Sequence, residues 1–191
     1  MTMMGKDLIG TEIEKVLMSA EEIDATTSRI AAEIDRDFEN YDGKVIILGI
    51  LKGSVMFMSD LMKKLRHPVE IDFMKVSSYV GTETSGRINI ILDLNRPDIS
   101  ESTIIIIEDI IDSGKTLSYL TEYLRLNGAR DVKTCTLLDK PDRRVVDFKP
   151  DYVGKIIPDE FVIGYGLDYN EKYRTLPFVG VLDRSVYAPD A

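Results

Sequence analysis

Three carboxylates and a cluster of small polar residues lie close together in the middle of this 191-residue sequence. Glu108 and Asp109 follow four consecutive isoleucines, and Asp112 directly precedes the segment Ser113-Gly114-Lys115-Thr116. Carboxylates can hold sugar hydroxyls or a hydrated cation. Free N–H groups at a helix start, hydroxyl donors and a glycine that allows close approach suit a phosphate. The segment therefore predicts a site for a phosphate beside sugar hydroxyls or a cation.

The residues around this segment predict the elements that hold it. The isoleucine run 104–107 is typical of a strand buried on both faces, and a helical pattern continues from Leu117 to about Leu126. A second strand, 44–51, is followed by Lys52-Gly53-Ser54 and a helix over 55–66. Both polar loops follow strands, and open α/β sheets bind ligands at the carboxyl ends of their strands. Lys52 is either a solvated charge or an anion ligand.

The remaining pattern predicts an α/β fold, with a mainly parallel twisted sheet and helices on both faces. Ser19 and Glu22 form a capping box for a helix to about Asn40, and residues 11–18 fit a strand or a short helix. We expect one domain over 1–191, with its core at about 40–150 and a small hood from 1–18 and 151–191. Further strands are expected at 69–76, 87–93, 131–138, 152–157 and 178–182, and a tail at 185–191.

Two further segments have open interpretations. The polar loop 77–86 is either a flexible hairpin tip or an active-site lid. Residues 161–169 are aromatic and contain two glycines, which a strand core rarely needs. This segment is either a wall on which a flat ligand stacks or a buried strand with a bulge.

Composition excludes several classes of function. The formal net charge of −9 argues against a nucleic-acid partner, and no apolar run approaches the ~18 residues of a membrane helix. Cys135 is the only cysteine, so no disulfide can form within the chain and a cytoplasmic location is predicted. Its side chain is expected to be buried and apolar. His67 is the only histidine, which excludes Ser-His-Asp catalysis and two-histidine metal sites. The first residues lack the apolar core of a signal peptide.

Three alternatives to a phosphate-sugar site fit the sequence less well. A purely structural turn would leave three acids at a strand end without a ligand to neutralise them. An ATPase P-loop needs a glycine five residues before Gly114, where this chain has Asp109. A nucleotide-sensing regulator that binds RNA or DNA is disfavoured by the acidic charge balance.

Together these loops resemble a known family. The run 106–116 is similar to the phosphoribosyl pyrophosphate signature of type I phosphoribosyltransferases. Residues 51–53, Ser78-Tyr79, Lys140 and the segment 161–169 resemble the other signatures of the hypoxanthine (hypoxanthine-guanine) phosphoribosyltransferases. The match covers about residues 12–183. It implies transfer of a phosphoribosyl group from phosphoribosyl pyrophosphate to a 6-oxopurine with Mg²⁺, giving IMP or GMP in purine salvage.

The resemblance also implies a role for each residue. Asp112 would be the catalytic general base or acid near the purine N7, and Lys140 would donate to the purine O6 while Phe161 stacks on the ring and Val162 reads its edge. Residues 77–86, with Ser78 and Tyr79, would form the lid. The other groups are the phosphoribosyl-binding residues (Glu108, Asp109, Ser113, Gly114, Lys115, Thr116), the pyrophosphate-binding residues (Lys52, Gly53, Arg174) and the Mg²⁺ ligands (Glu108, Asp109, Asp168).

The resemblance further implies a homodimer or homotetramer, and an unusual peptide geometry in the loop of Lys52 and Gly53. Two features depart from it. Glu160 stands where some members carry a basic residue, which bears on the preference among hypoxanthine, guanine and xanthine. The acidic connection 93–102 has no role that the sequence suggests.

Overall fold

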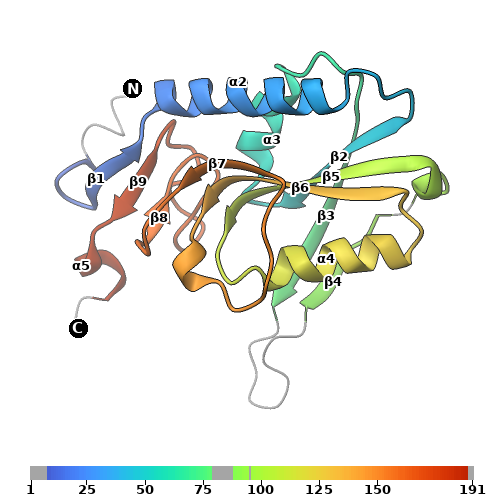
Figure 1. The fold of residues 1–191 in the computed structure, drawn as a ribbon. Coiled ribbons are helices and arrows are strands. Elements are labelled where there is room, and N and C mark those ends of the chain that lie inside the picture. The colour runs from blue at the N-terminus through green and yellow to red at the C-terminus, as the bar shows by residue number, and fades with distance from the viewer. Residues whose placement is uncertain (1–7, 79–87, 95, 189–191) are drawn as a thin grey trace.

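A six-stranded sheet forms the centre of the molecule, in a computed structural model that describes residues 8–78, 88–94 and 96–188. The strands lie in the order β4-β3-β2-β5-β6-β7 (Figure 1). Five strands are parallel, and β4 is antiparallel to β3. This confirms the predicted mainly parallel sheet. The strand bounds are β2 Lys44–Leu51, β3 Glu70–Ser78, β4 Ile88–Leu92, β5 Ser102–Ile111, β6 Asp131–Asp139 and β7 Tyr152–Ile156.

Helices cover both faces of this sheet, as predicted. Helices α2 (Ala20–Asp37) and α3 (Val55–Met62) pack on one face, and α4 (Lys115–Leu126) packs on the other (Figure 1). Ile105 and Ile107 of β5 point into the first core, and Ile104 and Ile106 into the second. All four are fully buried, and burying each side chain contributes about 1.5–3 kcal/mol. An isoleucine run therefore suits this central strand.

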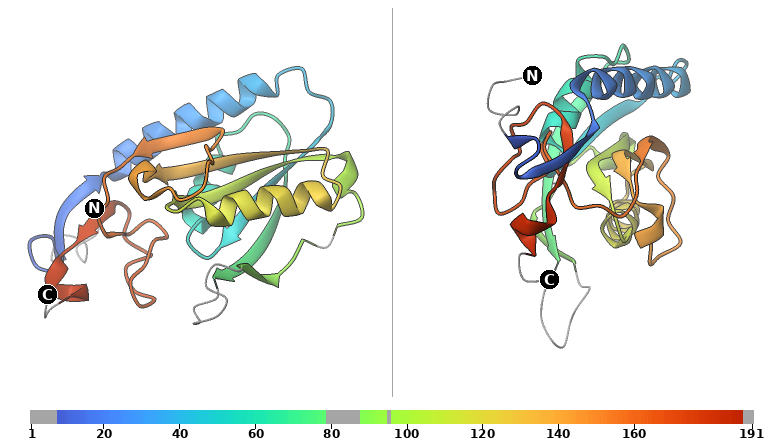
Figure 2. Two further views of the ribbon diagram at one scale, coloured as in Figure 1. Left: turned by 60° about the horizontal axis from the view of Figure 1, so that its bottom comes forward. Right: turned by 90° about the vertical axis from the view of Figure 1, so that its left-hand side faces the viewer.

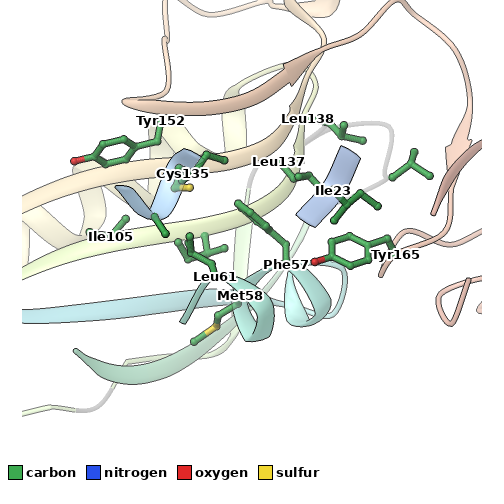
Figure 3. Packing of buried hydrophobic residues seen from close by; sticks show 14 of the residues in the cluster. Ile23, Phe57, Met58, Leu61, Ile105, Cys135, Leu137, Leu138, Tyr152 and Tyr165 are labelled. Carbon is green, nitrogen blue, oxygen red and sulfur yellow. The ribbon is translucent and has the colours of Figure 1, made fainter. Parts of the chain in front are cut away.

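The first core is built around α3 and the middle of the sheet. Figure 3 shows Phe57 of α3 pointing toward Leu137 of β6, whereas Met58 points away from β6. Met58 packs on β2, where a Cβ on Gly49 would lie 2.4 Å from its sulfur. Cys135 is fully buried, and this burial raises the pKa of its thiol well above the usual value. The prediction that Cys135 is a buried apolar side chain is confirmed.

A second, antiparallel sheet contains β1 (Ile13–Met18), β9 (Val179–Leu182) and β8 (Val162–Ile163), in the order β1-β9-β8. It lies at one end of the main sheet, where both ends of the described chain also lie (Figure 2). The expected hood is present, but its start at residue 151 is wrong because β7 completes the main sheet. The expected tail contains a short helix, α5 (Arg184–Tyr187), which Asp183 caps by accepting the N–H of Ser185.

Two predicted boundaries are wrong for reasons that lie in tertiary contacts. The helix expected over 55–66 ends at Met62, because Asp35 of α2 accepts the backbone N–H groups of Arg66 and His67 at 2.9 and 3.0 Å. The strand expected to end before Glu108 continues to Ile111, because β6 pairs with it along this whole length. The predicted capping box is confirmed by both of its hydrogen bonds, between Ser19 and Glu22.

The connection before β5 is held by a network of ion pairs. Arg96 donates to Asp98 at 3.0 Å and also pairs with Glu70 at the start of β3. Lys44 at the start of β2 pairs with both Asp98 and Glu70. The described part of the 93–102 connection therefore ties the amino ends of β2 and β3 together, which is the role that the sequence did not suggest. No helix in the described ranges has the length and hydropathy required to span a bilayer.

Candidate active site

The parallel topology brings three loops together at the carboxyl edge of the sheet. Strands β2, β5 and β6 are neighbours, so the loops that begin at Lys52, Asp112 and Lys140 leave adjacent strands. The backbone N–H of Lys140 donates to the carbonyl of Ile111 at 3.0 Å, which joins the last two loops directly. The predicted site residues in these loops therefore share one edge.

A small cavity of about 90 Å³ lies at the start of α4. Gly114 precedes the helix with a φ of +80°, a conformation that favours glycine, and a Cβ there would lie 2.7 Å from Arg144 Cδ. The first N–H groups of a helix have no partner within it and carry partial positive charge. These features fit a phosphate group. The lining residues are Glu108, Ile110, Ile111, Asp112, Ser113, Gly114, Thr116 and Leu117.

Glu108 and Asp109 lie in the last part of β5 with their carboxyl groups largely withdrawn from solvent. Glu108 Oε2 is buried and has no hydrogen-bond partner in the described structure. Burial, with the charge of Asp109, raises the pKa of Glu108 well above its usual value. Burial also raises the pKa of Asp109, to about 6. Neither carboxyl group forms an ion pair with another described residue, so a cation or sugar hydroxyls would supply the missing partner.

The loop after β2 packs closely against Asp109. The peptide bond between Leu51 and Lys52 is cis, which confirms the unusual geometry that the family resemblance implies. A Cβ on Gly53 would lie 1.6 Å from Asp109 Oδ2, so only glycine leaves room for this carboxylate. Gly166, with a φ of +101°, packs on the same loop, since a Cβ there would lie 2.0 Å from the carbonyl oxygen of Gly53.

Arg174 and Asp168 approach the same region from the C-terminal part of the chain. Arg174 donates to the carbonyl oxygen of Gly166 at 2.7 Å and pairs with Asp168 Oδ1 at 2.8 Å. Both charges act on the pKa of Asp109, which Arg174 lowers and Asp168 raises, although burial has the largest effect. The structure thus brings the predicted pyrophosphate and metal residues around Asp109.

No group of three or more His, Cys, Asp or Glu side chains in the described ranges gathers closely enough to hold a metal ion. Magnesium usually takes only one or two protein carboxylates and completes its shell with substrate phosphates and water. Glu108 and Asp109 fit that manner of binding, because Glu108 Oε2 is buried without a partner and burial disfavours the charged form of both groups.

A larger cavity, of about 420 Å³, brings Asp112, Lys140, Phe161 and Val162 together. Lys140 is 8% exposed, and its Nζ donates to the carbonyl oxygen of Glu160 at 2.6 Å. Asp112 lines both this cavity and the small one beside it. The cavity is also lined by Ile110, Arg143, Asp159, Glu160, Leu167 and Tyr187.

Two of these residues were missed by sequence reasoning. Arg143 pairs with Asp112 at 2.7 Å. The sequence feature that could have indicated it is the pair Arg143-Arg144 in the loop that follows Lys140. Tyr187 stacks on Phe161 with ring centroids 4.9 Å apart, and nothing in the tail indicated this contact. Phe161 is still 38% exposed, so part of its side chain remains accessible although Tyr187 stacks on it.

Glu160 lines the larger cavity, and only the first residues of the expected lid are described. Glu160 Oε1 pairs with Lys15 Nζ at 2.5 Å, while its Oε2 is buried and has no hydrogen-bond partner among the residues that the structure describes. Ser78 is the last residue of β3, where it pairs with Ile88 of β4. Tyr79 and the rest of the expected lid up to residue 86 lie outside the described residues.

Comparison with known proteins agrees with this arrangement. Residues 19–170 match the family model of the phosphoribosyl transferase domain. The hypoxanthine-guanine phosphoribosyltransferase of Bacillus subtilis is 49% identical over 92% of this chain and 97% of its own length. A crystal structure of a hypoxanthine phosphoribosyltransferase from Staphylococcus aureus is 44% identical, with a TM-score of 0.88 over 98% of both chains.

The chain also matches part of a larger protein. It is 44% identical to the bifunctional protein TilS/HprT of Listeria monocytogenes over 96% of this chain, but it spans only 28% of that protein. The family-model match over residues 19–170 includes the lining of both cavities except Tyr187, and it ends before Arg174. The chain therefore belongs to the phosphoribosyl transferase family, in the branch that contains the hypoxanthine-guanine phosphoribosyltransferases.

Proposed function

We propose that this protein transfers the 5-phosphoribosyl group from phosphoribosyl pyrophosphate to a 6-oxopurine. Hypoxanthine and guanine would give IMP and GMP, with release of pyrophosphate, in purine salvage. The observation that carries the proposal is the position of Asp112, which lines both the larger cavity of Lys140 and Phe161 and the small cavity at the start of α4. A flat base and a phosphorylated ribose need two such cavities side by side.

Lys140 is the residue to which we assign recognition of the purine. An ammonium group can only donate hydrogen bonds, so it suits the O6 acceptor of hypoxanthine or guanine and not the 6-amino donor of adenine. Lys140 is almost fully buried and already donates to the carbonyl oxygen of Glu160, and the 6-amino group of adenine could not accept a further hydrogen bond from it. That mismatch can discriminate by several powers of ten. Phe161 would stack on the base, and the backbone of Val162 would contact its edge.

Asp112 is the residue to which we assign proton transfer. In the forward reaction its carboxylate accepts the proton that the purine loses as a ring nitrogen bonds to ribose C1. Pyrophosphate leaves from the same carbon, and the transition state has oxocarbenium character. A positioned general base typically accelerates such a step by about 10²–10⁴-fold. Residues 113–116 would hold the 5′-phosphate at the start of α4.

Glu108 and Asp109 would hold Mg²⁺ together with the ribose hydroxyls, and Asp168 would hold Mg²⁺ separately, on the side of the pyrophosphate. Bound Mg²⁺ would supply positive charge that neutralises pyrophosphate as it leaves. Lys52, Gly53 and Arg174 would contact the pyrophosphate itself. Ser78 and Tyr79 would belong to a lid over residues 77–86 that excludes water from the reacting carbon.

We also propose a cytoplasmic homodimer or homotetramer. The single cysteine suits a reducing compartment. Three apolar side chains on the edge strand β4 and its neighbour β3 are 47–55% exposed, which supports association through this edge: Ile71, Ile91 and Leu92. Light scattering coupled to size-exclusion chromatography would give the mass directly.

The proposed activity has a direct test. The protein is mixed with phosphoribosyl pyrophosphate and Mg²⁺ together with hypoxanthine, guanine, adenine or uracil, and products are separated by chromatography. We expect IMP and GMP from the first two bases and almost no product from the others. Turnover of adenine or uracil in place of hypoxanthine would refute the proposal.

A further inference from the structure

The carboxylate of Glu171 lies between the two cationic side chains to which we assign pyrophosphate binding. Glu171 Oε2 is 2.9 Å from Lys52 Nζ, and Glu171 Oε1 is 3.5 Å from Arg174 Nη2. Each oxygen of one carboxylate thus faces a different cation. A bound phosphate oxygen would need the same two partners, so Glu171 stands where an anionic ligand is expected.

The backbone at Glu171 is unusual for this residue type. Asn170 and Glu171 have φ angles of +51° and +62°, and Tyr169 and Lys172 on either side exchange backbone hydrogen bonds of 3.3 and 3.0 Å. This is a two-residue hairpin turn in which both central residues are left-handed, and such turns favour glycine at the second position. A glutamate there costs free energy that glycine would not. The backbone outlier points to a use for the side chain.

The ion pairs of Glu171 are suited to exchange. The side chain of Glu171 is 66% exposed and that of Lys52 is 51% exposed, and ion pairs between such exposed groups contribute little to stability. A glutamate side chain is ionised at neutral pH. An arriving pyrophosphate would meet this negative charge unless the side chain moved away. The turn therefore presents a charge that competes with the ligand.

We propose, on the basis of the function proposed above, that Glu171 is an internal counterion of the pyrophosphate subsite. Its carboxylate leaves Lys52 and Arg174 when the pyrophosphate group of the substrate binds, and returns when the product departs. This exchange weakens the binding of pyrophosphate and speeds its release. Glu171 is then a residue that sets the affinity of the subsite without touching the reacting atoms.

Isothermal titration of wild-type protein and Glu171→Gln with inorganic pyrophosphate and Mg²⁺ tests this proposal. We expect the pyrophosphate dissociation constant to fall roughly 3–10-fold in the variant, the effect of removing exposed ion pairs. IMP lacks a pyrophosphate group, so its dissociation constant should change less than about twofold. A kcat limited by product release should fall as pyrophosphate binds more tightly.

Two further variants separate this effect from others. Glu14→Gln removes one exposed charge from β1 and should leave pyrophosphate affinity unchanged. Glu171→Gly removes the carboxylate and suits the turn, so it should bind pyrophosphate more tightly and also melt at a higher temperature. Unchanged or weaker pyrophosphate binding in both Glu171 variants would overturn the proposal. Failure of the proposed function would be seen separately, as wild-type protein that neither binds pyrophosphate nor forms IMP.

Discussion

Arg143 Nε lies 2.7 Å from Asp112 Oδ1, so the carboxylate to which we assign proton transfer is held in an ion pair. Arg143 also reaches Asp159 at 3.2 Å, and all three residues line the larger cavity. The side chains of Arg143 and Asp112 are 51% and 46% exposed, so their pair contributes roughly 0–1 kcal/mol to stability. Substitutions at Asp112 therefore test chemistry with little effect on folding.

Asp112→Asn should lower kcat by on the order of 10²–10⁴-fold, because an amide cannot accept the proton. Arg143 keeps Asp159 as a partner, so we expect the melting temperature to change by less than about 4 °C. Phosphoribosyl pyrophosphate should still bind within a few-fold of wild type, as measured by titration. Arg143→Gln serves as the control and should cost less than about tenfold in kcat. Turnover of Asp112→Asn within a few-fold of wild type would show that Asp112 does not transfer the proton.

Lys140→Gln should reduce the preference for hypoxanthine over adenine. A glutamine amide can donate to O6 and can also accept from a 6-amino group, whereas the ammonium can only donate. We expect the ratio of kcat/KM values for hypoxanthine and adenine to fall by roughly 10–100-fold. The measurement is product formation from each base on one preparation. A ratio that stays at the wild-type value would place purine selection elsewhere in the cavity.

Asp109→Asn should stabilise the ligand-free protein at pH 7 when no divalent cation is present. Burial raises the pKa of Asp109 to about 6 in the folded state, above the 3.8 of an unperturbed group. The folded state therefore binds this proton more tightly than the unfolded chain. The free energy of unfolding of the wild-type protein therefore falls by up to about 3 kcal/mol as pH rises from about 4 to 6. This loss of stability remains at higher pH.

Thermal unfolding of Asp109→Asn and wild-type protein between pH 4 and 8 measures this effect. The difference in melting temperature should grow through the window from pH 4 to 6 and then stay constant. Asp131→Asn is a matched control, because the carboxylate of Asp131 also accepts the N–H of the next residue in a strand but is exposed. A lower melting temperature for Asp109→Asn than for wild type at pH 7 would contradict the prediction.

Gly53→Ala should disturb the site without unfolding the protein. The added Cβ would lie 1.6 Å from Asp109 Oδ2, so either the carboxylate or the loop must move. We expect kcat/KM for phosphoribosyl pyrophosphate to fall by more than about tenfold, since misplaced binding groups are costly. Gly128→Ala is the control. Gly128 also has a positive φ, of +96°, but a Cβ added there would meet no other group within 4 Å. The substitution should therefore cost about 1 kcal/mol of stability and leave activity unchanged. Equal kinetics in both variants would refute a role for the close approach at Gly53.

Local sequence patterns correctly predicted the main strands, helices and turns around the site. The buried isoleucine run, the capping box of Ser19 and the polar turn before α4 each depend on residues that are close in sequence. The predicted ends of β5 and α3 were wrong because residues distant in sequence determine them. Pairing with β6 extends β5 past Glu108 and Asp109. Asp35 of α2 accepts the backbone N–H of Arg66, which therefore lies outside helix α3.

By itself, the sequence determined the parallel core and the polar turn before α4, because residue type and spacing along one element decide these features. The resemblance to a known family supplied most of the other candidate residues. Only the tertiary structure decided which charges face one another. Lys52 and Glu171 are 119 residues apart, and Phe161 meets Tyr187 from another element. Such pairs depend on how separate loops pack at one sheet edge, and no local pattern encodes that packing.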